Sequence, residues 1–313
     1  MSGLDALLRR SEQASFWSRL YRAPAKALAG YIYSARSASE SPARNEIPIH
    51  VVCVSDTHNT KPNLPDGDIL IHAGDLTQSG SRRELEEQIQ WLDAQPHRYK
   101  IVIPENHELS LDAQLSPRSE QSPVGGISNT KTGTVDWKSL IYLENTSTLL
   151  DMGNGRKIKV FGPPYTPKHG NWAFQYPRAK AAIWDEISIP EDTDILITHG
   201  PPKAHLDLGH LGCLFLRRAL WGMQHKPALH VFGHIHGGYG KEVVLWDSFQ
   251  RAYEAVMDGE SKWGSLGLLV YRWIVGWFTG WGTKAEHATV MVNAAAVGGV
   301  RDEKRRDAIC IDI

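Results

Sequence analysis

This sequence has few cysteines, almost no net charge and no long apolar run near its start, and each absence excludes a class of protein. Its three cysteines, Cys53, Cys213 and Cys310, lack the spacing of a metal or redox site. So sparse and odd a set favours a reducing compartment, and we expect a cytoplasmic protein. Because the 34 basic residues are balanced by 35 acidic ones, we expect no general electrostatic binding of nucleic acid. We also expect no secretory signal.

The first 46 residues differ from the rest in being rich in Arg, Ala and Ser. Their apolar positions do not share one helical face, and Pro24 interrupts them. We predict an N-terminal basic extension over residues 1–46, loosely docked or disordered, with a targeting peptide or a membrane-surface helix as the alternative. The remaining residues, 47–313, are predicted to form one domain that carries an aromatic-rich insert at 241–287.

Five short polar blocks each follow an apolar run that predicts a β-strand. The blocks are Asp56-Thr57-His58, Gly74-Asp75, Asn106-His107-Glu108, His199-Gly200 and Gly233-His234-Ile235-His236. Helical patterns lie between some of these strands, and short strands between 140 and 161 indicate a mixed rather than a purely parallel sheet. Because the carboxyl ends of neighbouring strands meet at one edge, we expect the five blocks to converge there.

The residue types in these blocks are those that bind metal ions. The candidate ligands are Asp56, His58, Asp75, Asn106, His199, His234 and His236. Carboxylate and amide oxygens suit hard cations, whereas imidazole suits Mn, Fe and Zn. The mixed set therefore predicts two divalent transition-metal ions close together.

The spacing also suggests how the ligands divide. Asp75 can bridge the ions, because a carboxylate has two oxygens. Asp56 and His58 suit one ion, and Asn106 and His199 suit the other. His234 and His236 lie two apart, so on an extended strand they face the same way and can serve one ion each.

A pair of ions of this kind hydrolyses phosphate esters. A hydroxide held between the ions would attack phosphorus in line. His107, beside the ligand Asn106, is free to donate a proton to the leaving oxygen, and Glu108 could orient its imidazole.

The other nine histidines fit ordinary structural roles. Three lie within apolar strands, where we expect packed side chains: His50, His72 and His230. Six are expected in solvated loops or helices: His97, His169, His205, His210, His225 and His287.

The series D-x-H, G-D, N-H-E, H-G and G-H-x-H resembles the calcineurin-like metallophosphoesterases, and most nearly the metallophosphoesterase-domain-containing proteins of the brain and fetal-brain type with their fungal relatives. The resemblance covers about residues 48–240 and the last strands, and it includes the stretches 106–112, 162–165, 172–174, 195–202 and 229–240. It implies an α/β fold, a two-sheet β-sandwich flanked by helices, and two divalent ions with Mn favoured and Fe or Zn as alternatives.

The resemblance also implies a division of ligands. Residues at the positions of Asp56, His58, Asp75 and His236 bind one ion, and those at Asp75, Asn106, His199 and His234 bind the other. His107 takes the position that acts on the leaving group.

One position departs from the family pattern. Pro104-Glu105 precedes Asn106, where the family usually has Gly. Gly permits a turn tight against the metals, whereas Glu105 adds a Cβ and a carboxylate. We expect Glu105→Gly to raise turnover; unchanged or lower activity would refute this. A weakly active or inactive metal-binding scaffold is therefore the alternative function.

The insert ends in an apolar stretch over 264–282 that Arg272 interrupts and that carries Trp273, Trp277 and Trp281. Its glycines, its length and its Arg make a membrane span unfavourable. One interpretation is a helix packed on the domain or on a partner subunit. The other is a peripheral membrane contact through 263–282, since Trp favours the headgroup zone.

The sequence thus predicts a metal-dependent phosphodiesterase that acts on a small phosphate ester such as a cyclic nucleotide. Phospholipid head groups become possible substrates if the insert contacts a membrane. A membrane-peripheral adaptor is a further alternative function. A protein Ser/Thr phosphatase is disfavoured, because Leu76-Thr77-Gln78 follows Gly74-Asp75 instead of V-D-R-G. The oligomeric state stays open.

Overall fold

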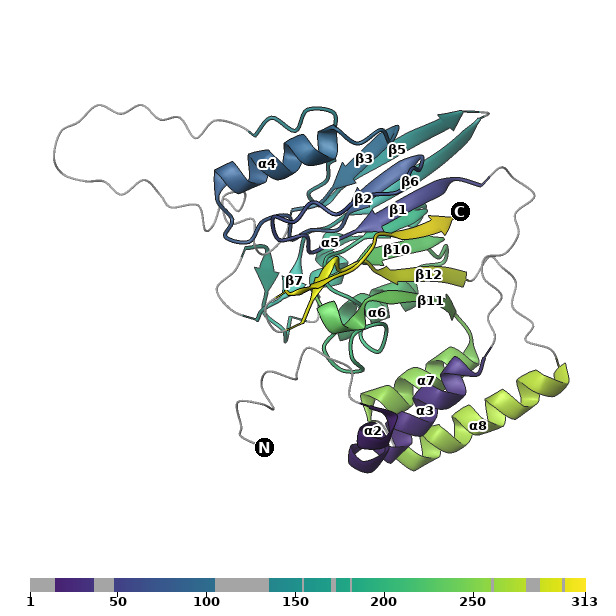
Figure 1. Ribbon diagram of the computed structural model, residues 1–313. Helices are drawn as coiled ribbons and strands as arrows, with labels where there is room; N and C mark the ends of the chain where they lie inside the picture. The colour runs from purple at the N-terminus through teal and green to yellow at the C-terminus, as the bar shows by residue number, and fades with distance from the viewer. Residues whose placement is uncertain are drawn as a thin grey trace, which may run out of the picture.

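The computed structural model describes residues 15–36, 48–104, 135–153, 155–169, 173–180, 182–259, 262–279, 288–299 and 302–313. Two β-sheets form its centre (Figure 1). The first has the strand order β15-β1-β2-β3-β4, and the second has the order β11-β12-β10-β9-β6-β5. The predicted two-sheet sandwich flanked by helices is confirmed.

The first sheet is mainly parallel. Its strands are β1 (His50–Val54), β2 (Ile69–His72), β3 (Tyr99–Val102), β4 (Ile141–Tyr142) and β15 (Ile309–Asp312). Only β15 runs antiparallel to its neighbour, β1.

The second sheet is mixed, as expected. Its strands are β5 (Thr146–Gly153), β6 (Arg156–Gly162), β9 (Ile195–Ile197), β10 (Leu229–Phe232), β11 (Gly240–Leu245) and β12 (Ala288–Asn293). The two edge strands, β5 and β11, are antiparallel to their neighbours, and the inner strands are parallel. The short pairs β7 (Thr166–Pro167) with β8 (Gln175–Tyr176), and β13 (Val297–Gly298) with β14 (Lys304–Arg305), lie outside the two sheets.

Strand β1 shows why these apolar runs fold as they do. Val51 and Cys53 point into the core between the two sheets, whereas Val52 and Val54 point the other way, toward α4. Successive side chains on a strand alternate between faces, so a strand covered on both sides must be apolar throughout. This explains the unbroken apolar runs before the polar blocks.

Helices cover the outer faces of both sheets. Helix α4 (Arg82–Asp93) packs on the first sheet, and Ser81 caps it by accepting a hydrogen bond from the backbone N–H of Glu84. Helices α5 (Ile183–Ile187) and α6 (Leu214–Gly222) pack on the second sheet.

Four helices form a separate layer beyond the edge strand β11 (Figure 1). They are α2 (Phe16–Arg22), α3 (Pro24–Ser34), α7 (Ser248–Asp258) and α8 (Lys262–Thr279). We call them the helical layer. Ala25 and Ala29 of α3 lie in one buried cluster with Phe249 of α7 and Leu269 of α8. None of the helices that the structure describes has the length and apolarity needed to span a bilayer.

The helical layer corrects one expectation. Residues 24–34 form α3, which packs in one buried cluster with α7 and α8, so a loosely docked or disordered segment is wrong for them. Helix α2 contributes no buried residue. Pro24 does not break a helix but begins one, because proline at the first helical position gives up an N–H that has no partner there. Arg36 then ties this segment to α7 through an ion pair with Asp247 at 2.5 Å. The division into domains at residue 46 stays a prediction.

Candidate metal centre

Six of the seven predicted ligands lie together at the carboxyl ends of four strands. Asp56 and His58 follow β1, Asp75 follows β2, His199 follows β9, and the block from Gly233 to His236 follows β10. Just past the ends of β1 and β12, Ser55 pairs with Ala295 in a β-bridge between the sheets. The bridge holds together the two edges that carry the ligands.

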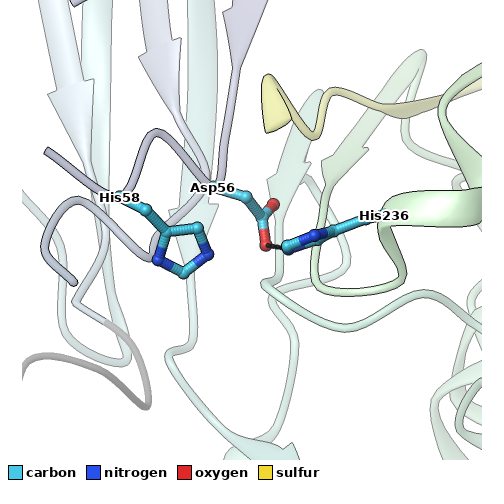
Figure 2. A group of neighbouring side chains, drawn as sticks. All are labelled: Asp56, His58 and His236. Atoms are coloured by element: carbon cyan, nitrogen blue, oxygen red, sulfur yellow. Dashed lines mark hydrogen bonds and ion pairs between the residues drawn. The ribbon is translucent and has the colours of Figure 1, made fainter. Parts of the chain in front are cut away.

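The first group of donors contains Asp56, His58 and His236 (Figure 2). The Oδ1 of Asp56 lies 3.1 Å from Nε2 of His236. Both oxygens of the same carboxylate accept from the backbone N–H of His234 at 3.0 Å. One ligand atom from each of the three residues lies within 4.8 Å of the others, which is close enough for one ion.

The second group contains Asp75, His199 and His234. The Oδ2 of Asp75 lies 3.2 Å from Nε2 of His199 and 3.9 Å from Nε2 of His58. Asp75 therefore stands between the two groups, where a bridging carboxylate would have to be. Nδ1 of His234 lies 3.2 Å from Nε2 of His199, so these two rings turn their nitrogens toward each other.

Backbone carbonyl groups behind the candidate ligands orient two of the imidazoles. Nδ1 of His58 lies 3.2 Å from the carbonyl oxygen of Thr77, and Nδ1 of His199 lies 2.9 Å from that of Ala73. If these nitrogens carry the protons and donate, each ring keeps Nε2 as the acceptor that faces the cluster. Metal-binding histidines are oriented in this way.

Burial and charge make the donor set suitable for cations. Asp56 is fully buried and Asp75 is 3% exposed. Burial acts to raise the pKa of Asp56, but the hydrogen bond to His236 and the charges of His199 and His236 hold it well below its ordinary value. Burial, with the nearby His199 and His169, lowers the pKa of His234 well below its ordinary value. An ionised Asp56 carboxylate and a neutral His234 imidazole are both suited to binding divalent ions.

The backbone at these ligands is held in an uncommon conformation. Asp56, His58, Asp75 and His234 all have positive φ angles, of 50°, 43°, 53° and 65°. Such angles are unfavourable for residues other than glycine. They are more frequent at functional sites, where the surrounding structure holds the backbone in place. The four residues therefore turn sharply at their strand ends, which aims their side chains into one place.

Gly233 shows how little room the turns leave. A Cβ on this residue would lie 1.9 Å from Oδ2 of Asp56. The glycine before His234 is thus required by the close approach of the β10 loop to a candidate ligand.

The C-terminal hairpin supplies supporting residues that the sequence analysis missed. Asp302 accepts from Nδ1 of His236 at 3.2 Å, and its hydrogen bond completes an Asp302–His236–Asp56 chain. Burial acts to lower the pKa of His236, but hydrogen bonds to Asp302 and Asp56 outweigh it and raise the pKa to about 10. Arg306 donates to the carbonyl oxygens of His236 and Val297, at 2.6 Å and 2.9 Å. These residues lie about 70 positions from the ligand, and no local pattern points to them.

Two buried histidines contact threonine hydroxyl groups in the loops that carry the candidate ligands. Nε2 of His72 lies 3.0 Å from the hydroxyl of Thr57, between the ligands Asp56 and His58. Nε2 of His230 lies 2.9 Å from the hydroxyl of Thr198, next to the ligand His199. Both histidines are packed as predicted, and burial lowers the pKa of each to about 3, so both stay neutral.

Other histidines differ from expectation. His205, predicted to lie in solvent, is fully buried, 3.0 Å from Glu242 and 3.2 Å from Glu254. His97 is also buried, whereas His50 is exposed at the start of β1. His169 lies on an exposed loop, yet its ring centre is 4.5 Å from that of His234. It is therefore a neighbour of the donor groups that no sequence signal indicated.

Part of the predicted site lies outside the described residues. This holds for the ligand Asn106, for the predicted proton donor His107 and its partner Glu108, and for Glu105. Their roles stay predictions.

Comparison with known proteins places the chain in a family. Residues 49–238, more than half of the chain, match the calcineurin-like phosphoesterase family, and the chain belongs to it. Metallophosphoesterase domain-containing protein 1 of Homo sapiens is 38% identical over 204 residues, which is 60% of this chain and 61% of that protein. The predicted resemblance is confirmed.

Two further similarities differ in strength. A protein of Emericella nidulans named probable rhamnogalacturonate lyase C is 64% identical over 310 residues, which is 99% of this chain but 29% of that protein. The chain thus spans less than two thirds of the length of the human relative and under a third of the fungal one. The crystal structure of TT1561 of Thermus thermophilus matches with a TM-score of 0.40 and 14% identity, over 64% of this chain and 87% of that chain.

Family membership and the two donor groups together support metal-dependent hydrolysis of phosphate esters.

Proposed function

We propose that this chain is a two-metal phosphodiesterase that hydrolyses small phosphodiesters such as cyclic nucleotides, with Mn²⁺ as the favoured ion. The observation that carries the proposal is the place of Asp75. Its carboxylate lies 3.2 Å from His199 in one donor group and 3.9 Å from His58 in the other. A carboxylate shared by two groups of buried donors is the arrangement that holds two ions a few Å apart.

In this proposal Asp56, His58 and His236 would hold one ion, His199 and His234 would hold the other, and the carboxylate of Asp75 would serve both. Asn106 joins the second group. When bound, the ions supply Lewis-acid activation of water and of the phosphoryl oxygens.

The chain's own residues prepare this chemistry. The carbonyl oxygens of Thr77 and Ala73 hold the imidazoles of His58 and His199, so that these two rings need little reorganisation when an ion binds. His107 is proposed to give a proton to the leaving oxygen, with Glu108 orienting it. His169, whose ring centre lies 4.5 Å from that of His234, is proposed to contact a phosphate oxygen of the substrate.

The name of the fungal relative supports no lyase activity in this chain. The alignment covers 29% of that protein, and the same residues of this chain match the phosphoesterase family.

Hydrolysis of bis-p-nitrophenyl phosphate with added Mn²⁺ tests the proposal, with Asp75→Asn as the disabled variant. Asp207→Asn is a matched control, because Asp207 is also buried, at 1% exposure, but binds backbone amides at Ala204 and Gly209 instead. We expect turnover in the wild type and in the control, and loss of it in Asp75→Asn.

Equal turnover in Asp75→Asn would refute the proposed centre. A wild type that binds two ions but turns over no substrate would instead support the metal-binding scaffold.

A further inference from the structure

Helix α8 is apolar on all sides, although only one of its faces is packed. Leu266 and Leu269 are buried against α3 and α7. The rest of the helix exposes large apolar side chains: Trp263 (65%), Leu268 (47%), Tyr271 (58%), Ile274 (45%), Trp277 (69%) and Phe278 (87%). Apolar surface of this extent on a soluble helix marks a contact with something outside the chain.

The N-terminal helices extend the same surface. Trp17 and Tyr21 of α2 are 75% and 92% exposed, and Leu28 and Tyr31 of α3 are 37% and 65% exposed. Among the described residues, twelve large apolar side chains are exposed, and all but Leu149 and Leu211 lie on α2, α3 or α8. The exposed apolar residues are therefore concentrated in the helical layer.

The charges on these three helices are all of one sign. Their sequences contain no Asp or Glu, and their basic residues are Arg19, Arg22, Lys26, Lys262 and Arg272. The arginines among them are exposed. The acids of the helical layer lie on α7 and are used internally, since Glu254 pairs with His205 and Asp258 with Lys203.

We propose that α2, α3 and α8 form a surface that binds anionic lipid membranes. Tyr and Trp are amphipathic and favour the headgroup zone, and cations around them are attracted to acidic headgroups. Helix α8 lies along the surface in this proposal, with its exposed side in the membrane boundary. A second copy of the chain is a poorer occupant, because two faces that carry only positive charge would repel each other.

Sedimentation with vesicles tests this surface. Wild-type protein should pellet with phosphatidylcholine vesicles that contain phosphatidylserine, less with pure phosphatidylcholine, and less again at high salt. The variant Trp277→Ser/Phe278→Ser should bind the anionic vesicles at least roughly tenfold more weakly, since it removes two aromatic side chains from the contact. Arg22→Glu should weaken only the preference for the anionic vesicles.

Leu149→Ser is the matched control, because Leu149 is 59% exposed on β5, away from the helical layer. It should bind vesicles like the wild type, and all variants should keep wild-type hydrolysis of the water-soluble bis-p-nitrophenyl phosphate.

Three results would overturn the proposal. The first is wild-type protein that pellets with neither kind of vesicle. The second is equal pelleting of the wild type and Trp277→Ser/Phe278→Ser. The third is a wild-type dimer in light scattering that this variant abolishes, without vesicle binding, which would show that the face binds a second copy. Because the assay measures binding alone, its result does not depend on the proposed phosphoesterase activity.

Discussion

The metal centre and the helical layer depart from ordinary burial in opposite directions. The metal centre buries charged groups, with Asp56 at 0% and Asp75 at 3% exposure. The helical layer exposes aromatic ones, with Tyr21 at 92% and Phe278 at 87% exposure. Buried charges and exposed apolar patches are both unfavourable for an isolated chain.

The two departures are built differently. In the metal centre, the candidate ligands follow strand ends, four of them have positive φ angles, and backbone carbonyl groups hold the imidazoles of His58 and His199. In the helical layer, the exposed aromatic residues lie on regular helices and point away from the packed cluster. A site for ions needs fixed geometry, whereas a lipid surface needs only apolar area and charge. The difference suggests that each region is completed by a different kind of ligand.

The largest effect is expected from a comparison of two buried histidines. His199 lies in a donor group, and His205 lies in an ion-pair network with Glu242 and Glu254. Both histidines are fully buried. His199→Gln should lower turnover by roughly 10³-fold, or about 4 kcal/mol of transition-state stabilisation. His205→Gln should keep most of the turnover in soluble protein assayed near neutral pH. Comparable losses in both variants would mean that burial, and not metal binding, accounts for the effect.

The ion network predicts how stability depends on pH. Burial acts to lower the pKa of His205, but Glu242 and Glu254 raise it to about 10, above the ordinary value of about 6.5. The native state therefore holds a proton that the unfolded state releases first. The resulting stabilisation is complete below about pH 6.5 and is lost as the pH rises to about 10.

Denaturant unfolding across this range measures the effect. We expect the free energy of unfolding of the wild type to fall by an amount on the order of 3 kcal/mol. The fall should be much smaller in His205→Gln. A wild-type curve that is flat or rises over this range would contradict the network.

A smaller effect is expected at the support for His236. Asp302→Asn keeps the shape of the side chain but weakens the hydrogen bond to Nδ1 of His236. Loss of such a partner typically lowers metal affinity roughly 10- to 100-fold. Titration of metal-free protein with Mn²⁺ measures this, and Asp307→Asn, in the same C-terminal segment, is the control. Identical Mn²⁺ affinities in the two variants would show that Asp302 does not support metal binding through His236.

The smallest effect is expected on stability in the helical layer. Trp277 and Phe278 are 69% and 87% exposed, so changing both to Ser should alter the free energy of unfolding by less than about 1 kcal/mol. Thermal unfolding of the lipid-free protein checks this. A large loss of stability would show that these side chains are packed within the protein and are not available to a membrane.

The convergence of six candidate ligands could be predicted from the sequence better than their surroundings. The strands before Asp56 and His199 are buried on both faces, so their apolar runs are visible, and the polar block after each run marks its carboxyl end. The ligands come together because parallel strands end at the same edge. Asp302 and Arg306 could not be found in this way, since they reach His236 only through the folding of the distant C-terminal hairpin.

The helical layer was the least predictable region. Helix α3 packs through the small residues Ala25 and Ala29, which give only a weak apolar stripe in the sequence. His205 gave no sign of burial because its partners Glu242 and Glu254 lie 37 and 49 positions away. In the 263–282 stretch, Leu269 is packed within the chain, whereas Trp277 is exposed, and the peripheral membrane contact stays a proposal.

Calorimetric titration of metal-free protein with Mn²⁺ is the most direct test of the central claim that two donor groups hold two ions. We expect two equivalents for the wild type. We expect one equivalent for His236→Gln, because the group around His199 and Asp75 is left intact. Binding of no more than one ion by the wild type, or unchanged binding of two in His236→Gln, would contradict the claim.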